Sequence, residues 1–173
     1  TPDGKCPAGI ASTGTVGVPP VIVGGKVYAL ASDATLRRFS DTLADESWSV
    51  AAPSCADVPA AMTYGSGSIY FACGIAGLKA EVHAVDLSTG AASLLATLPS
   101  KPGAPAVFLS GDLLLGTNDG KLHRLTPPGS GAGAWSDLWS AAPALGAPVR
   151  GILAAQQDGD GVVAYATTAD GQL

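Results

Sequence analysis

A unit of about forty residues recurs along this chain, and it constrains the fold more than any other feature of the sequence. In residues 20–41 the unit reads as an apolar segment, a Gly24-Gly25 turn, a second apolar segment, a short turn and a third apolar segment. Comparable stretches begin at Pro59, Pro105 and Pro148. This period, with four short strands in each unit, is typical of a β-propeller, in which every unit forms one sheet, or blade. We therefore predict an all-β propeller of four-stranded antiparallel blades.

The blades are expected over residues 19–173, after an N-terminal arm at residues 1–18 that has little apolar periodicity. Their approximate limits are 19–53, 59–99, 104–143 and 147–173. Glycine-containing pairs such as Gly24-Gly25 and Asp119-Gly120 mark tight hairpin turns between the strands. The expected strands are 21–23, 26–32, 35–40 and 46–50 in the first blade, 61–64, 68–73, 81–86 and 92–97 in the second, 106–109, 113–117, 121–126 and 135–140 in the third, and 149–155 and 162–167 in the fourth.

The fourth unit stops inside its third strand, at Leu173. About three and a half blades cannot close a ring, and an open row would expose apolar blade faces to water. We expect either that the chain is part of a longer polypeptide or that two such chains combine. The chain begins at Thr1 rather than Met, which fits removal of a signal peptide or, equally, a shortened sequence.

The composition excludes several classes of function. The net charge is −5, and the nine Lys and Arg residues are scattered, so they form no stripe that could follow nucleic-acid phosphates. No apolar run approaches the roughly eighteen residues needed to cross a bilayer as a helix. Only 13% of the residues are charged, and the 23 Gly and 13 Pro residues suit short strands joined by turns.

The three cysteines, Cys6, Cys55 and Cys73, are too few for a disulfide-framework miniprotein and wrongly spaced for a zinc knuckle. In a blade, the linker that enters the first strand and the turn after the second strand lie on the same face of the propeller. Cys55 and Cys73 occupy these two places in the second unit, so a disulfide between them is geometrically reasonable. Buried free thiols and a Cys6–Cys55 pairing remain alternatives. A disulfide would indicate an oxidising compartment.

The third strands resemble the G-x-L-Y-A-L-D-x-x-T-G core of PQQ-like propeller repeats. The resemblance is strongest in the second unit, and Trp48 and Trp139 stand where that family has its blade-closing tryptophan. The family includes quinone-dependent alcohol dehydrogenases and non-enzymatic outer-membrane assembly lipoproteins. The dehydrogenases typically have a vicinal cysteine pair, which this chain lacks, so the resemblance implies a fold without a catalytic or cofactor-binding residue. The matching segments are 35–41 (TLRRFSD), 81–90 (EVHAVDLSTG) and 120–125 (GKLHRL), preceded by 27–29 (VYA) and 69–71 (IYF).

Candidate sites were weighed against structural interpretations. His83 and His123 hold the same place in successive units, and packing or a hydrogen bond to a turn explains them better than a shared ligand. The acidic pair Asp158 and Asp160 alternates with glycine, as in a calcium loop, although a hairpin turn explains the pattern too. Trp135 and Trp139 are candidates for an exposed aromatic binding surface.

We expect a non-catalytic, extracytoplasmic propeller module for protein–protein interaction or surface scaffolding, without a cofactor other than a possible Ca²⁺. The partner would be another protein or the remaining blades, and homo-oligomers are compatible with this expectation. One alternative is a fragment of a propeller enzyme, quinoprotein-like or glycan-active, whose site is completed by further blades. A weaker alternative is a subunit of an extracellular filament, which the Ala- and Gly-rich composition would suit.

Overall fold

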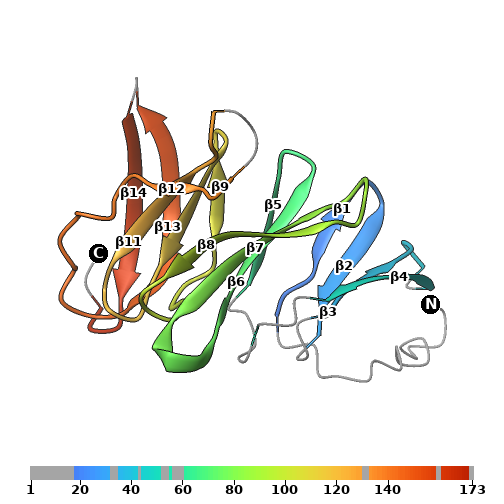
Figure 1. The fold of residues 1–173 in the computed structure, drawn as a ribbon, viewed down its shortest axis with the longest axis horizontal. Helices are drawn as coiled ribbons and strands as arrows, with labels where there is room; N and C mark the ends of the chain where they lie inside the picture. Colours follow the sequence, from blue (N-terminus) through green and yellow to red (C-terminus); the bar gives the residue numbers. More distant parts are fainter. Residues whose placement is uncertain are drawn as a thin grey trace.

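The chain folds into a row of antiparallel sheets that follow one another in sequence order (Figure 1). The computed structural model describes residues 18–31, 35–42, 44–51, 55, 61–129, 133–158 and 161–171. The predicted N-terminal arm lies outside these residues, except for Val18. In the described parts of the chain, no helix has the length and apolar character needed to cross a membrane.

Three sheets have four strands each, and a fourth sheet has two. Within each sheet, neighbours in the sequence are neighbours in the ladder, which is the topology expected of propeller blades. We refer to these sheets as blades 1 to 4. Their strands are β1 Val21–Val23, β2 Lys26–Leu30, β3 Thr35–Phe39 and β4 Asp45–Ala51; β5 Met62–Gly65, β6 Ser68–Gly74, β7 Ala80–Asp86 and β8 Ala92–Leu98; β9 Val107–Leu109, β10 Asp112–Gly116, β11 Leu122–Thr126 and β12 Ser136–Asp137; and β13 Val149–Asp158 and β14 Gly161–Thr168.

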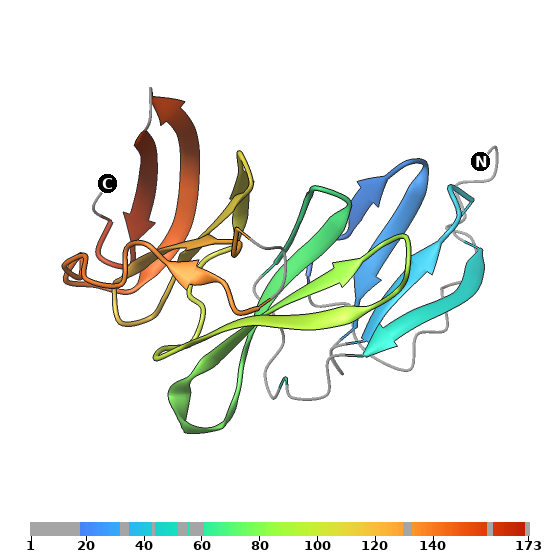
Figure 2. The same ribbon diagram turned by 45° about the horizontal axis from the view of Figure 1, so that its top comes forward.

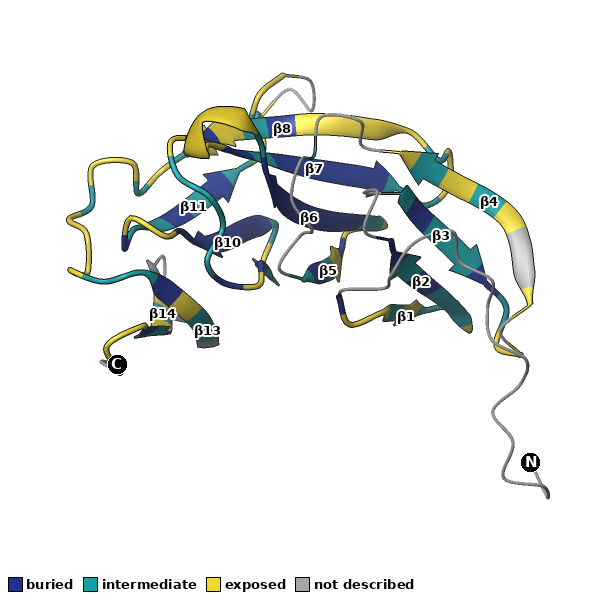
Figure 3. Cartoon of the chain, turned by 90° about the horizontal axis from the view of Figure 1, so that it is seen from below, coloured by how far each residue is buried: buried dark blue, intermediate teal, exposed yellow. Residues whose placement is uncertain are grey.

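The blades are arranged radially, as the sequence predicts. The first strands β1, β5, β9 and β13 contact one another in succession along the inner side of the row. Figure 3 shows the row as an arc, with β4 and β8 on its outer side and β1 and β5 on its inner side. The turned view in Figure 2 shows the sheets facing one another, and the described blades do not close into a ring. The predicted fold class is confirmed.

Two predicted strands are wrong in extent, and one of them, expected at 149–155, continues to Asp158 as β13. The strand expected at 135–140 is reduced to β12, Ser136–Asp137. The reason is local: the Asp137 carboxylate accepts hydrogen bonds from the backbone N–H groups of Trp139, at 3.1 Å, and Arg124, at 3.3 Å. A carboxylate that binds the amide two residues ahead favours a turn over a continued strand.

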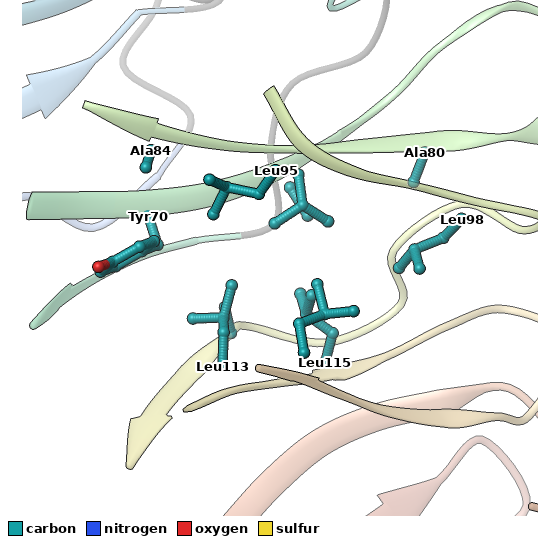
Figure 4. Close-up of a cluster of buried hydrophobic side chains, with 11 residues drawn as sticks. Tyr70, Ala80, Ala84, Leu95, Leu98, Leu113 and Leu115 are labelled. Atoms are coloured by element: carbon teal, nitrogen blue, oxygen red, sulfur yellow. The ribbon is translucent and has the colours of Figure 1, made fainter. Parts of the chain in front are cut away.

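The core lies between the blades. Along β6, side chains on one face, including Ile69 and Phe71, pack toward blade 1, and those on the other, including Tyr70 and Ala72, pack toward blade 3. A strand buried on both faces needs apolar residues at nearly every position, which explains the uninterrupted apolar run of β6. Figure 4 shows the second contact, with side chains of blade 2 above Leu113 and Leu115 of β10.

Close approach of the blades is specified in two ways. A Cβ atom added at Gly65 would lie 2.1 Å from Cδ1 of Phe108 in blade 3, and one added at Gly116 would lie 2.3 Å from Cγ1 of Val149 in blade 4. The second is a main-chain hydrogen bond between blades: Leu95 of blade 2 accepts it from the N–H of Trp135 in blade 3, at 2.9 Å. Leu95 lies in β8, whose ladder with β7 shifts register after Val82. Adjacent blades are therefore joined by packing and by a main-chain bond.

Replacement of Leu113 by alanine should destabilise the protein strongly. Leu113 is fully buried between blades 2 and 3, and such a truncation costs about 2–5 kcal/mol in the free energy of unfolding. Leu94 of β8 is 51% exposed, so Leu94→Ala should change this free energy by less than about 0.5 kcal/mol. Urea unfolding of the two variants provides the measurement. Equal losses would contradict a core located between these blades.

Candidate functional site

A disulfide connects Cys55 and Cys73, whose Cα atoms are 5.5 Å apart. Cys55 lies in the chain that leads from β4 to β5, and Cys73 lies near the end of β6. Cys73 is fully buried, whereas Cys55 is partly exposed and packs against the core between blades 1 and 2. Of the pairings that the sequence left open, this is the one that the structure contains. Cys6 lies outside the described residues.

His83 lies beside this disulfide on the same face of blade 2. In the β6–β7 ladder, Cys73 pairs with Glu81 and Phe71 pairs with His83, so the pleat directs all four side chains to one face. The His83 ring stacks on Phe71 with a centroid distance of 5.5 Å, and its Nε2 is 3.1 Å from Oε2 of Glu81. Burial lowers the pKa of His83, and the charge and hydrogen bond of Glu81 offset this only in part. The imidazole is therefore neutral near pH 7.

The two sulfur atoms and a ring nitrogen of His83 lie within 4.8 Å of one another. Sequence reasoning treated the cysteines and the histidine as separate features and missed this convergence. The signal was present in the expected strands: when β6 and β7 pair across the loop at 75–79, positions 73 and 81 face each other, and positions 71 and 83 form the next pair on the same face.

His123 holds the equivalent place in blade 3 but has different surroundings. Its Nε2 is 3.2 Å from the Thr117 hydroxyl, and its Nδ1 is 2.7 Å from the Asp137 carboxylate. Thr117 takes the place that Cys73 has in blade 2, and Asp137 belongs to β12 of the same blade. Each histidine is thus held by residues of its own blade, and His123 stabilises the ladder from β10 to β12.

Two hollows lie on the face of the row that carries the β6–β7 loop, the β8–β9 linker and the β10–β11 turn, and the first of them reaches from blade 2 to blade 3. We call this face the linker face. One hollow, of about 260 Å³, is lined by Leu78, Ser100, Lys101, Asn118 and Asp119. The other, of about 250 Å³, is lined by Lys79, Thr97, Leu98 and Pro99.

Leu78 projects at the rim of the first hollow. It ends the short 3₁₀ segment η1 (Ala76–Leu78), is 71% exposed, and has a φ of 64°. Left-handed backbone is costly for a leucine, and the preceding Gly77 is left-handed too. Strained backbone clusters at functional sites, so Leu78 is a candidate contact residue.

Of the other predicted site residues, the structure describes the side chains of Trp135 and Trp139. Trp135 lies half-buried against Tyr70, with ring centroids 5.8 Å apart, and so contributes to the core between blades 2 and 3. Trp139 is half-buried in the turn after β12. Asp160 lies outside the described residues, and of Asp158 only its backbone position at the end of β13 is described. The calcium loop and the aromatic binding surface remain predictions.

The D-x-x-T-G part of the repeat has a purely structural role. One carboxylate oxygen of Asp86 accepts hydrogen bonds from the hydroxyl and backbone N–H groups of both Ser88 and Thr89, at 2.6–3.0 Å. These bonds, with the Ser88 hydroxyl making the largest contribution, lower the pKa of Asp86 from 3.8 to about 2. The motif therefore fixes the turn between β7 and β8.

Replacement of Asp86 by asparagine should remove a pH dependence of stability. Since the pKa of Asp86 is lower in the folded protein, its hydrogen bonds stabilise the fold above pH 3.8 and are lost as the pH falls toward 2. Urea midpoints at neutral pH and at about pH 3 should therefore differ less for Asp86→Asn than for the unchanged protein. Asp41→Asn, at an exposed turn, is the control and should keep the full difference.

Removal of the disulfide should weaken the fold. The cysteines are separated by 18 residues in sequence, and a cross-link that closes a loop of this size contributes about 3 kcal/mol to the free energy of unfolding. The double variant Cys55→Ala, Cys73→Ala should lose about that amount in urea unfolding. Adding a dithiol should lower the urea midpoint of the unchanged protein and should not change that of the double variant. Equal urea midpoints for the two proteins without the dithiol would refute a stabilising cross-link.

Solved structures with a similar fold cover most of this chain. The computationally designed Ika4 protein aligns with a TM-score of 0.67 at 15% identity, over 93% of this chain and 89% of its own. BamB from Moraxella catarrhalis aligns with a TM-score of 0.56 at 17% identity, over 90% of this chain and 41% of its own. This chain thus spans about two fifths of that BamB structure.

None of the curated proteins matches the chain. A family model does: the one described as outer membrane protein assembly factor BamB matches residues 4–112. This is more than half of the chain, and the matched part contains blades 1 and 2, with the Asp86 turn, and β9. The PQQ-like resemblance seen in the third strands is confirmed. The chain belongs to the family of the outer membrane protein assembly factor BamB.

Proposed function

We propose that this chain is a non-catalytic, extracytoplasmic propeller module that binds a protein partner through its linker face. Membership of the BamB assembly-factor family is the observation that carries the proposal. An assembly factor for outer membrane proteins acts through contacts with other proteins.

The disulfide supports the proposed location. Disulfides persist in oxidising compartments such as the periplasm and the cell exterior and are rare in the cytosol. The Cys55–Cys73 bond links the segment before blade 2 to the end of β6, and it lies at the end of the sheet that carries the linker face. Cys73 is fully buried and Cys55 is partly exposed. An oxidising environment would therefore keep that face in the geometry described here.

The linker face supports a protein contact by its chemistry. Leu78 supplies an exposed apolar side chain, and Lys79 and Lys101 belong to the linings of the two hollows beside it. Interfaces typically place an apolar anchor at the centre and polar groups around it. The partner expected here presents an apolar side chain or pocket to Leu78, with acidic groups toward the lysines.

A photo-crosslinking amino acid at position 78 should capture a protein of the cell envelope. Ile22 of β1 is the matched control, because it is as exposed as Leu78, at 71%, but lies in the inner strand of blade 1 instead of the linker face. Crosslinking in the native host should give a defined adduct from position 78 and none from position 22. Adducts from both positions, or from neither, would contradict a contact at the linker face.

The captured partner then allows a quantitative measurement with purified proteins. Leu78→Asn removes the apolar side chain, and asparagine tolerates the left-handed backbone at this position. Binding should weaken about tenfold or more, as expected for an anchor residue. An unchanged affinity, with unfolding behaviour also unchanged, would remove Leu78 from the contact. Fractionation that finds the native protein only in the cytosol would contradict the proposed location.

A further inference from the structure

The Cys55–Cys73 disulfide lies beside His83, and after reduction the two cysteines and the histidine are all potential metal ligands. Cysteine sulfurs and a neutral histidine nitrogen bind borderline-soft cations, above all Zn²⁺. Here Cys55, Cys73 and His83 place one such atom each within 4.8 Å of the others. The Glu81 carboxylate accepts a hydrogen bond from Nε2–H of His83, at 3.1 Å.

We propose that reduction of the Cys55–Cys73 disulfide creates a binding site for Zn²⁺, with the two thiolates and the His83 imidazole as ligands. Glu81 is a positioning residue: it holds one ring nitrogen while the other binds the cation, the carboxylate–histidine–metal arrangement that is common around zinc. The disulfide and the metal are then mutually exclusive occupants of one site, which the redox state selects.

The electron and proton balance is simple. A dithiol supplies two electrons and two protons, the S–S bond breaks, Cys55 and Cys73 become thiols, and the dithiol becomes a cyclic disulfide. Zn²⁺ then displaces the two thiol protons to solvent as it forms two Zn–S bonds. The cation and two thiolates have no net charge, which suits a site at which Cys73 and His83 are buried.

The geometry is close to what the cation needs. With Zn–S bonds of about 2.3 Å and Zn–N bonds of about 2.0–2.1 Å, the ligands of a tetrahedral site lie roughly 3.5–3.8 Å apart. The sulfur–nitrogen distances already fall within 4.8 Å, so binding requires mainly that the two sulfurs separate after the bond breaks. Cys55 belongs to a linker, whereas Cys73 and His83 belong to paired strands. The adjustment therefore falls mainly on Cys55.

Neither blade 1 nor blade 3 has a cysteine beside a histidine at the matching places. The places of Cys73, Glu81 and His83 in the β6–β7 hairpin correspond to Thr117, Lys121 and His123 in blade 3. In blade 1 they correspond to Ala31, Thr35 and Arg37. Blade 3 thus keeps the histidine but pairs it with oxygen atoms of Thr117 and Asp137. A histidine that only stabilised its own blade could have hydroxyl and carboxylate partners in blade 2, as His123 has in blade 3.

Co²⁺ and Zn²⁺ alone are the probes for the experiment. The protein, carrying Cys6→Ser so that Cys55 and Cys73 are its only thiols, is reduced with a dithiol, freed of it by gel filtration under argon, and titrated with Co²⁺. We expect one Co²⁺ per chain, a thiolate-to-cobalt charge-transfer band, and displacement by Zn²⁺. The oxidised protein should show no band.

His83→Gln and Glu81→Gln test the two remaining roles. Loss of the imidazole ligand should weaken Zn²⁺ binding more than tenfold, and loss of the positioning carboxylate should weaken it about tenfold. His123→Gln, at the matched place in blade 3, should leave Zn²⁺ affinity unchanged. Circular dichroism reports whether each reduced protein is folded.

Three results would overturn the proposal: no charge-transfer band in the reduced protein, whether folded or not; equal Zn²⁺ affinity for the unchanged protein and His83→Gln; or an equal loss in His123→Gln. None of these measurements depends on a protein partner. Failure of the metal site therefore leaves the proposed interaction module standing, and failure of the crosslinking experiment leaves the metal site standing.

Discussion

The contact between neighbouring sheets is the interaction on which the structure depends. β6 and β10 are buried along nearly their whole length, since each lies in a sheet with neighbours on both sides. A single antiparallel sheet of this size could not remove enough apolar surface from water to be stable alone. Each blade is therefore stabilised mainly by the next, and the close approach at Gly65 and Gly116 shows how little space separates them.

This dependence determines where chemistry can occur. Side chains along β6 and β10 are used for packing, so the reactive groups near these strands lie mainly toward strand ends, turns and linkers. The Cys55–Cys73 pair and the Leu78 rim belong to such places, and His83 reaches them from β7 because its side chain shares a face with Cys73. Blade 2 thus combines a strand buried on both faces with the Cys55, Cys73 and His83 cluster at one end.

Much of the fold could be predicted because its signals are local. Paired glycines and Asp-Gly turns mark the hairpins, and a strand buried on both faces must be apolar throughout, so most expected strands agree with the observed ones within one or two residues. The strand at 135–140 failed because a single carboxylate, Asp137, diverts the backbone after two residues. Turn chemistry of this kind depends on side-chain orientation, which an apolar pattern does not report.

The candidate site was harder to predict because its members come from different segments. Cys73, Glu81 and His83 meet through strand register, which the sequence indicates, but Cys55 joins them from a linker whose course no periodicity specifies. The exposed position of Leu78 was missed for a related reason: its backbone φ of 64° belongs to a loop in which glycine and leucine are both left-handed.

The position of the disulfide also determines how the molecule would respond to mechanical tension. A pull transmitted along the polypeptide from blade 1 reaches Cys55 and passes through the sulfur bridge to Cys73, so that β5 and most of β6 carry no load. Blade 1 would unfold under the load while the β5–β6 hairpin of blade 2 remained folded. Breaking the sulfur bridge would add that hairpin to the length that force can extract.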